Sequence, residues 1–273
     1  MNDKFRTWED AVVWLRSQPD KADLVRACYY DDPLTEAAER FYQSREWAEI
    51  RNHLKGKKGN VLDLGAGMGI SSYAFSRSGW NVTAAEPDPS RIVGSGAIRN
   101  LAEDSGLEIA VVRSFAEFLP FRDNVFDVVY GRQVLHHAQD LQRMCREISR
   151  VLRPGGMFLA TREHVINNHD DLDIFLRDHP LQKMYGGENA FLLEEYLDAL
   201  RQCDIHVTEI LNPCASEINL YPESYDSMKK TIAEKFFFPF PKLIPDAMLQ
   251  VIGKINNVPG RLYSFIGRKE REG

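Results

Sequence analysis

The sequence is poor in cysteine and has no long apolar run. No stretch of 18 or more apolar residues occurs, so no membrane-spanning helix is predicted. The first ten residues lack the basic-then-apolar pattern of a secretory signal, and we therefore expect a reducing, cytoplasmic location. No CxxC pair is present, which argues against a disulfide framework. The four cysteines are Cys28, Cys145, Cys203 and Cys214.

The chain also lacks an excess of positive charge. Its 273 residues include 34 Lys and Arg against 40 Asp and Glu, which gives a formal net charge of -6. Nucleic acids and anionic lipids attract basic proteins, so we expect no nucleic-acid partner and no stable insertion into a membrane. Hydrophobic residues make up 44% of the chain, which is enough for a large buried core.

Short apolar runs alternate with helix-period segments from about residue 59 to residue 161. This alternation predicts an α/β fold with a mostly parallel sheet covered by helices on both faces. Strands are predicted at 60–64, 80–86, 107–112, 126–130, 157–161, 205–211 and 261–268. Helices are predicted at 70–78, 89–104, 141–152 and 192–201.

A glycine-rich turn follows the first predicted strand. In the segment VLDLGAGMG at 61–69, three glycines alternate with other residues, and the missing Cβ atoms let a ligand lie on the backbone. A dinucleotide fingerprint needs its third glycine at position 70, which is Ile70 here. Glu86, at the exit of the second strand, is placed to accept hydrogen bonds from two ribose hydroxyls. Together these features predict an adenosyl ligand.

Three later segments complete a pattern that resembles a known family. The sequence AAEPD lies at 84–88, SFAEFLPFRDNVFDVVY at 114–130, and VLHH followed by REISRVLRPGG at 134–156. With the glycine turn, they resemble the class I S-adenosylmethionine-dependent methyltransferases, in particular the small-molecule branch called methyltransferase type 11. The resemblance implies a Rossmann-like sheet of seven strands, the last antiparallel, with the cofactor S-adenosyl-L-methionine at the carboxyl ends of the strands.

The resemblance also implies which residues bind the cofactor. They surround its methionine part, its ribose, its adenine and its amino group, in that order along the chain. The family often has an acidic side chain where this chain has Ser114, so a serine hydroxyl or the Phe115 backbone would replace it at the adenine. The implied residues are Asp63, Gly65, Ala66, Gly67, Gly69, Glu86, Pro87, Ser114, Phe115, Gly131 and Arg132.

Three histidines follow strands on the side where the family places the methyl acceptor. Methyl transfer is a displacement at an activated carbon, so alignment matters most and a base is optional. His136 and His137 follow the fourth strand and His164 follows the fifth, so all three are candidate catalytic residues. Because adjacent residues point in different directions, at most one of His136 and His137 faces the methyl group. The alternative is that one of them caps or packs against a helix.

The end of the fifth strand and the polar segment after it supply the candidate substrate-binding residues. A metal site built from His164, His169, Asp170 and Asp173 matches no ligand spacing, and we expect no metal. The candidate substrate-binding residues are Glu163, His179, Tyr185 and Glu188.

The sequence divides into an N-terminal cap and a methyltransferase domain. Residues 1–50 predict two or three amphipathic helices, and residues 51–273 form the domain. Within it, 165–189 is the acceptor-side segment and 212–260 is an insert before the last strand. The aromatic run at 236–240 is flanked by lysines and is expected to cap the site. A dimer surface and a membrane contact are the alternatives.

These observations predict a methyltransferase that acts on an oxygen or a nitrogen of a small organic acceptor. The residues after the fourth strand are not the Asn/Asp-Pro-Pro-aromatic set of enzymes that methylate nucleic-acid bases. Carbon or lipid methylation is one alternative, and a catalytically silent cofactor-binding subunit is another. A homodimer is left open.

Overall fold

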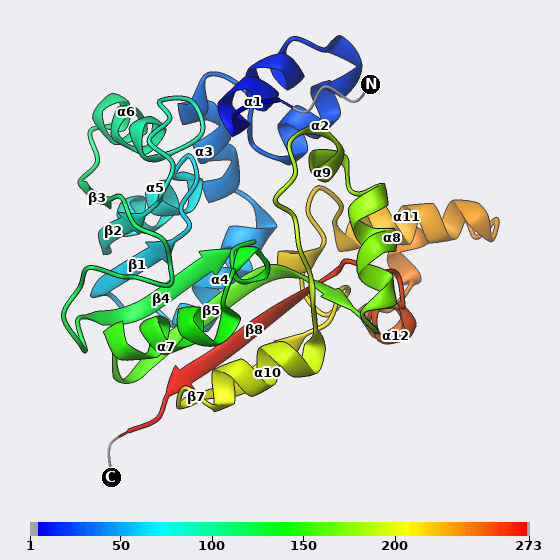
Figure 1. The fold of residues 1–273 in the computed structure, drawn as a ribbon. Coiled ribbons are helices and arrows are strands. Elements are labelled where there is room, and N and C mark those ends of the chain that lie inside the picture. Colours follow the sequence, from blue (N-terminus) through cyan, green and yellow to red (C-terminus); the bar gives the residue numbers. More distant parts are fainter. Residues whose placement is uncertain (1–4, 272–273) are drawn as a thin grey trace.

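The computed structural model describes residues 5–271 and contains one eight-stranded sheet (Figure 1). The strand order is β3-β2-β1-β4-β5-β8-β7, and the short β6 pairs with β5. β8 is antiparallel to β5 and β7, whereas the other pairings are parallel. The strands are β1 (Asn60–Leu64), β2 (Asn81–Ala85), β3 (Ile109–Val112), β4 (Phe126–Arg132), β5 (Leu152–Ile166), β6 (Phe191–Leu192), β7 (Ile205–Leu211) and β8 (Arg261–Lys269).

This sheet confirms the expected α/β architecture with an antiparallel last strand. β1 and β7 have the predicted bounds, and the two-residue β6 is an addition that the sequence pattern did not predict. The helices that connect the strands are α5 (Ile70–Arg77), α6 (Ser95–Ser105), α7 (Leu141–Val151) and α10 (Leu193–Arg201).

Two hydrophobic clusters hold helices against the two faces of the sheet. On one face, α7 buries the predicted stripe of Leu141, Met144 and Ile148 together with residues of α10. On the other face, Trp47 and Phe75 pack against residues of the central strands. Each such side chain contributes about 1.5–3 kcal/mol by leaving water, so both helix layers are firmly attached to the sheet.

The predicted start of the helix at 89–104 is wrong by six residues. α6 begins at Ser95, not at residue 89, because the chain first makes a tight turn. The Ser90 hydroxyl accepts hydrogen bonds from Ile92 and Val93, and the Ser95 N–H donates to the carbonyl oxygen of Asp88 at 2.7 Å. The preceding residues therefore bond among themselves before the helix starts.

β5 is longer than the predicted strand and is interrupted by a bulge. It runs to Ile166, so Glu163 and His164 lie within the strand and not after it. The register with β8 shifts between Ala160 and Glu163, and Arg162 has a left-handed backbone with φ of 63°. A bulge of this kind turns the side chains that follow it.

Residues 5–54 contain four α-helices, whereas two or three were predicted for residues 1–50. Figure 1 shows α1 and α2 at one end of the molecule, close to α9 (Pro180–Met184). The next two helices pack on the sheet, and the domain boundary expected at residue 50 falls inside the second of them. The helices are α1 (Trp8–Arg16), α2 (Ala22–Ala27), α3 (Leu34–Tyr42) and α4 (Arg45–Leu54).

The insert before the last strand forms a projecting helical pair. Figure 1 shows α11 (Tyr225–Lys235) projecting from the molecule, and α12 (Asp246–Ile255) follows it before the last strand. A further helix, α8 (Asp170–Asp178), follows β5. Contrary to expectation, the aromatic run does not cap the site in this structure, because Phe237 is 95% exposed and its neighbours are also exposed. The insert instead packs through Leu249 and other residues on its inner side. Within residues 5–271, no helix combines the length and the apolar character needed to cross a membrane.

Candidate functional site

The glycine turn after β1 leaves open space beside its backbone. Gly65, Gly67 and Gly69 all have left-handed φ values, between 54° and 86°, which residues with a side chain rarely adopt. A side chain at Gly65 would collide with Val134, whereas no atom lies within 4 Å of a Cβ built at Gly67. The buried Ala66 fixes the turn through its N–H bond to the Ala85 carbonyl. The turn is therefore held in place with one open side.

Glu86 lies beside that open side, at the exit of β2. One carboxylate oxygen accepts the Gly67 N–H at 2.8 Å, and the other accepts the Asp88 N–H at 2.9 Å. Burial raises the pKa of Glu86 to about 7, although these two N–H bonds oppose the rise. Each oxygen keeps a further lone pair, so the carboxylate can accept hydrogen bonds from a diol such as ribose. Pro87 follows directly and is half-buried.

Asp63, in β1, bonds to the helix that follows the glycine turn. Its Oδ2 accepts the hydroxyl hydrogens of Ser71 at 2.7 Å and Ser72 at 2.5 Å, both in the first turn of α5. Burial raises the pKa of Asp63 to about 6, and the two serines partly offset that rise. In this structure Asp63 therefore orients the start of α5, and that orientation places the glycine turn.

The predicted adenine-side residues lie in the loop after β3. The Ser114 hydroxyl donates to the carbonyl oxygens of Phe115 and Phe118, at 3.0 and 2.6 Å. The hydroxyl hydrogen is thus already bonded within the loop. The hydroxyl oxygen can still accept a hydrogen bond from a ligand, for example from an amino group. The Phe115 ring is largely exposed.

Gly131 and Arg132 end β4, but the Arg132 side chain points away from the glycine turn. Its guanidinium donates to both carboxylate oxygens of Glu46 in α4, at 2.7 and 3.1 Å. It also lies over the rings of Tyr29 and Phe41. Only the backbone of Arg132 and the buried Gly131 are left for a ligand. The side chain instead ties the N-terminal helices to the sheet.

The acceptor-side groups converge on the buried carboxylate of Glu163. Its Oε1 accepts the Val134 N–H at 3.1 Å, and its Oε2 accepts the His136 N–H at 3.1 Å and the Nδ1 hydrogen of His136 at 2.7 Å. Burial raises the pKa of Glu163, and the backbone N–H donors oppose this. Since the Val134 side chain lies against Gly65, a single residue separates this carboxylate from the glycine turn.

His136 and His164 are neighbouring buried imidazoles with similar bonding. Their ring centroids are 4.7 Å apart. His164 bonds through Nδ1 to the Gly260 carbonyl at 2.7 Å, as His136 bonds through Nδ1 to Glu163. Burial lowers the pKa of both histidines well below the usual value, so both rings are neutral near pH 7.

The segment between α9 and β6 adds Glu188 to these imidazoles. A Glu188 oxygen lies 3.8 Å from Nε2 of His136, and its other oxygen lies 3.8 Å from Nδ1 of His179. Burial raises the pKa of Glu188 and lowers that of His179. The predicted catalytic and substrate-binding residues therefore do meet, although they come from three separate segments.

Two predicted residues lie at the rim of this cluster. His137 is exposed and bonds through Nδ1 to the Gly187 carbonyl at 2.9 Å, so only His136 of the adjacent pair points inward. Tyr185 packs against Trp8 of α1, with ring centroids 5.6 Å apart. The first helix thus contacts the segment that carries Glu188.

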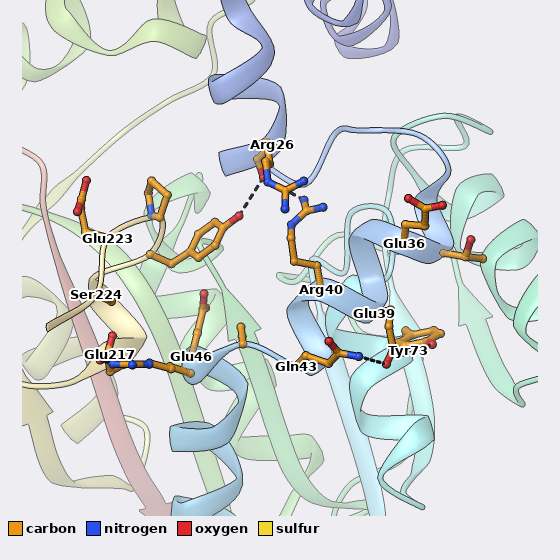
Figure 2. A pocket seen from close by; sticks show the side chains of 15 residues that line it. Arg26, Glu36, Glu39, Arg40, Gln43, Glu46, Tyr73, Glu217, Glu223 and Ser224 are labelled. Carbon is orange, nitrogen blue, oxygen red and sulfur yellow. Dashed lines mark hydrogen bonds and ion pairs between the residues drawn. The ribbon is translucent and has the colours of Figure 1, made fainter. Parts of the chain in front are cut away.

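A separate cleft of about 760 Å³ lies between the N-terminal helices and residues 217–224 (Figure 2). It is lined by charged side chains and contains none of the histidines or turn glycines. Arg45 pairs with Glu217 at 2.9 Å and Arg40 pairs with Asp31 at 2.6 Å. Its charges are thus largely compensated within the chain, as expected where helices pack.

Comparisons with known proteins agree with this geometry. Residues 62–160 match the family model described as a methyltransferase domain. The chain is 32% identical over 159 residues to a sarcosine/dimethylglycine N-methyltransferase of Halorhodospira halochloris, covering 55% of this chain and 52% of that protein. It is 26% identical to a ubiquinone biosynthesis O-methyltransferase of Rhizobium leguminosarum bv. trifolii, covering 73% and 78%.

A solved structure extends the likeness to most of the fold. A geranyl diphosphate methyltransferase in complex with S-adenosylmethionine superposes with a TM-score of 0.59 at 14% identity, covering 88% of this chain and 91% of that one. At that identity the likeness concerns the fold alone. The chain spans about half the length of the first curated relative. The match over residues 62–160, the strand order and the glycine turn thus make this part of the chain similar to the methyltransferase domain of class I S-adenosylmethionine-dependent methyltransferases.

Proposed function

We propose that this protein transfers a methyl group from S-adenosylmethionine to an oxygen atom of a small organic acceptor. The observation that carries the proposal is the buried cluster of His136, His164 and Glu188, which Glu163 and Val134 connect to the glycine turn. A hydroxyl group must lose its proton to become a good nucleophile. Unprotonated imidazole nitrogens and a carboxylate are the groups that draw such a proton away.

The residues around the turn fit the cofactor. Glu86 would accept hydrogen bonds from the ribose hydroxyls, and the open space beside Gly67 would admit the methionine part. Pro87, Ser114 and Phe115 would border the adenine, and the backbone at Gly131 and Arg132 would receive the amino group. When bound, the cofactor supplies a methyl group that is already activated on a sulfonium sulfur.

The acceptor would bind near Nε2 of His136, the His164 ring and Glu188. Because Glu163 holds the Nδ1 hydrogen of His136, the Nε2 lone pair is directed toward the acceptor. Tyr185 and His179 would line the outer side of that space and help to determine which acceptor fits. Burial of the cluster excludes water and strengthens each polar contact.

Nitrogen methylation is the second candidate. The curated relative that is 32% identical is named an N-methyltransferase, and a neutral amine needs no proton acceptor before transfer. The two candidates differ in what they require of His136. Transfer to a neutral amine would be largely insensitive to loss of its Nε2 lone pair, whereas transfer to a hydroxyl would not.

Paired acceptors distinguish these functions. Methyl-labelled cofactor is incubated with small alcohols, phenols and sugars and with amines of the same carbon skeletons. We expect label in the hydroxyl compounds and a sharp loss of that label in His136→Asn. Label confined to amines would overturn oxygen as the acceptor atom. If no acceptor in either set gains label while the cofactor still binds, the chain is a silent cofactor-binding subunit.

A further inference from the structure

We propose that His136, His164 and Glu188 bind a divalent transition-metal ion that holds the acceptor oxygen. One potential ligand atom from each residue lies within 4.8 Å of the other two. The inference rests on the proposed function, because it states how the same cluster activates the acceptor. It also revises the sequence-based expectation of no metal, which considered His164 together with His169, Asp170 and Asp173 instead of His136 and Glu188.

The hydrogen bonds of the two histidines leave the same atom free on each ring. Nδ1 of His136 faces the Glu163 carboxylate, and Nδ1 of His164 faces the Gly260 carbonyl. Both partners only accept hydrogen bonds, so each Nδ1 carries the hydrogen and each Nε2 keeps its lone pair. Ligands of metal ions show this arrangement, in which an outer carboxylate or carbonyl fixes the tautomer and orients the ring.

Glu188 supplies a carboxylate with no hydrogen-bond donor in the described part of the chain. Its side chain is only 9% exposed, and the basic side chains near its oxygens are His136 and His179, each at 3.8 Å. A buried carboxylate needs a partner that offers positive charge or hydrogen bonds. The free nitrogens of the neutral imidazoles carry neither a positive charge nor a hydrogen to donate to this carboxylate. A cation would bind the carboxylate and both free nitrogens at once.

The ligand set favours a transition metal over magnesium or calcium. Two imidazole nitrogens with one carboxylate suit Zn²⁺ and related ions, whereas Mg²⁺ and Ca²⁺ prefer oxygen ligands. Zinc bonds to nitrogen are about 2.0–2.1 Å long, so the three ligand atoms would draw together around the ion. Two glycines, Gly186 and Gly187, precede Glu188, and their conformational freedom would permit that movement. A fourth position then remains for the acceptor oxygen.

The ion would change how the acceptor hydroxyl is activated. Coordination of oxygen to a divalent ion lowers the pKa of the hydroxyl, so that its proton passes to water and its electron pair stays on oxygen. The oxygen then forms a bond to the methyl carbon as the sulfur–carbon bond breaks and sulfur keeps that electron pair. His136 acts in this step as a ligand, and Glu163 acts as a positioning residue.

The first test measures metal binding and needs no acceptor. The full chain is dialysed against a chelator and then titrated with Zn²⁺ by calorimetry, and Co²⁺ is added separately to record its visible absorption. We expect one equivalent of either ion to bind, with cobalt bands that report a site containing nitrogen ligands. Failure to bind Zn²⁺ stoichiometrically would overturn the proposal.

Variants of the cluster locate the site. Glu188→Gln and His164→Gln should weaken Zn²⁺ binding at least ~100-fold, and Glu163→Gln should weaken it by about 10–100-fold, as loss of an outer partner does. His169→Gln is the matched control, because His169 is exposed and outside the cluster, and it should bind Zn²⁺ as the wild type does. Each variant must still bind S-adenosylhomocysteine, which shows that it is folded. Undiminished Zn²⁺ binding in folded Glu188→Gln would overturn the proposal.

Turnover separates this inference from the proposed function. With a hydroxyl acceptor that the protein methylates, chelation should reduce turnover at least ~100-fold, and Zn²⁺ or Mn²⁺ should restore it. Full turnover in the chelated protein would overturn the metal and leave oxygen methylation standing. Stoichiometric metal binding with no methylation of any hydroxyl compound would instead overturn the proposed function.

Discussion

The proposed cofactor end and the proposed acceptor end of this molecule are built in different ways. At the cofactor end, both oxygens of Glu86 accept backbone N–H groups, from Gly67 and Asp88. At the acceptor end, His136 meets Glu163 and Glu188 from distant parts of the chain, and the Glu188 oxygens receive no hydrogen bond from the described residues. The carboxylate of the first site is satisfied without a ligand, whereas the second site lacks a partner for its charge.

The two sites get their shape from different kinds of structure. The glycine turn is shaped by backbone conformation and by β1 and β2, which are paired in register over their whole length. The acceptor cluster is shaped by the bulge in β5 and by the loop that carries Glu188. We therefore expect changes in the cluster to affect turnover and changes around the turn to affect cofactor affinity.

The largest effect is expected from a substitution of His136, which should reduce turnover and leave cofactor affinity unchanged. His136→Asn keeps a side-chain donor for Glu163 but removes the Nε2 lone pair, so turnover of a hydroxyl acceptor should fall by about 10²–10⁴-fold. Affinity for S-adenosylhomocysteine, measured by calorimetry, should change little. A variant that loses cofactor affinity as well would show that the two ends are one unit.

The next effect concerns the cofactor end alone. Glu86→Ala should weaken binding of S-adenosylmethionine and S-adenosylhomocysteine by about 1.5–3 kcal/mol, because charge-assisted hydrogen bonds to the ribose are lost. Calorimetry of both ligands checks this value. Glu103→Ala, which removes an exposed carboxylate from α6, is the matched control and should bind normally. Equal affinities of Glu86→Ala and wild type would remove Glu86 from the site.

The smallest effect is a dependence on pH. The pKa of Glu86 is about 7 in the ligand-free protein, so the carboxyl group is increasingly protonated below that pH and accepts fewer hydrogen bonds. Cofactor affinity should therefore fall by up to about tenfold per pH unit below the pKa of this group. Calorimetry on either side of that pKa measures the change, and Glu86→Ala should show a flatter profile.

The same group also makes the stability of the ligand-free protein depend on pH, in the opposite direction. The folded-state pKa of Glu86 is raised from 4.5 to about 7, so the folded state binds more protons than the unfolded state within that window. The contribution of Glu86 to the free energy of unfolding thus falls as pH rises through it. A Glu86 contribution that rose with pH in chemical denaturation would contradict the raised pKa.

Sequence reasoning succeeded where neighbouring residues decide the structure. β1 was predicted to the residue because a continuous apolar run ends at a glycine turn, and Glu86 lies at the exit of β2 as predicted. α7 was predicted from its apolar stripe. In each case the signal is carried by one short segment of the chain.

It failed where distant segments decide the structure. Nothing near Arg132 in sequence indicates that its side chain pairs with Glu46, 86 residues earlier. His136 and His164 do lie together with Glu163, but their hydrogen bonds depend on a bulge at Arg162 that no local pattern indicates. The exposed position of Phe237 likewise depends on how the insert packs.

The insert is fastened to β5 at both of its ends. The Arg162 guanidinium donates to the carbonyl oxygens of Ile218 and Tyr221 near the start of the insert, and Nδ1 of His164 bonds to Gly260 at its end. The entropic cost of closing a flexible loop grows only with the logarithm of its length, by about 0.6 kcal/mol for each doubling. The chain between these two anchors can therefore lengthen or shorten at little cost in stability, while the sheet and the cluster keep their geometry.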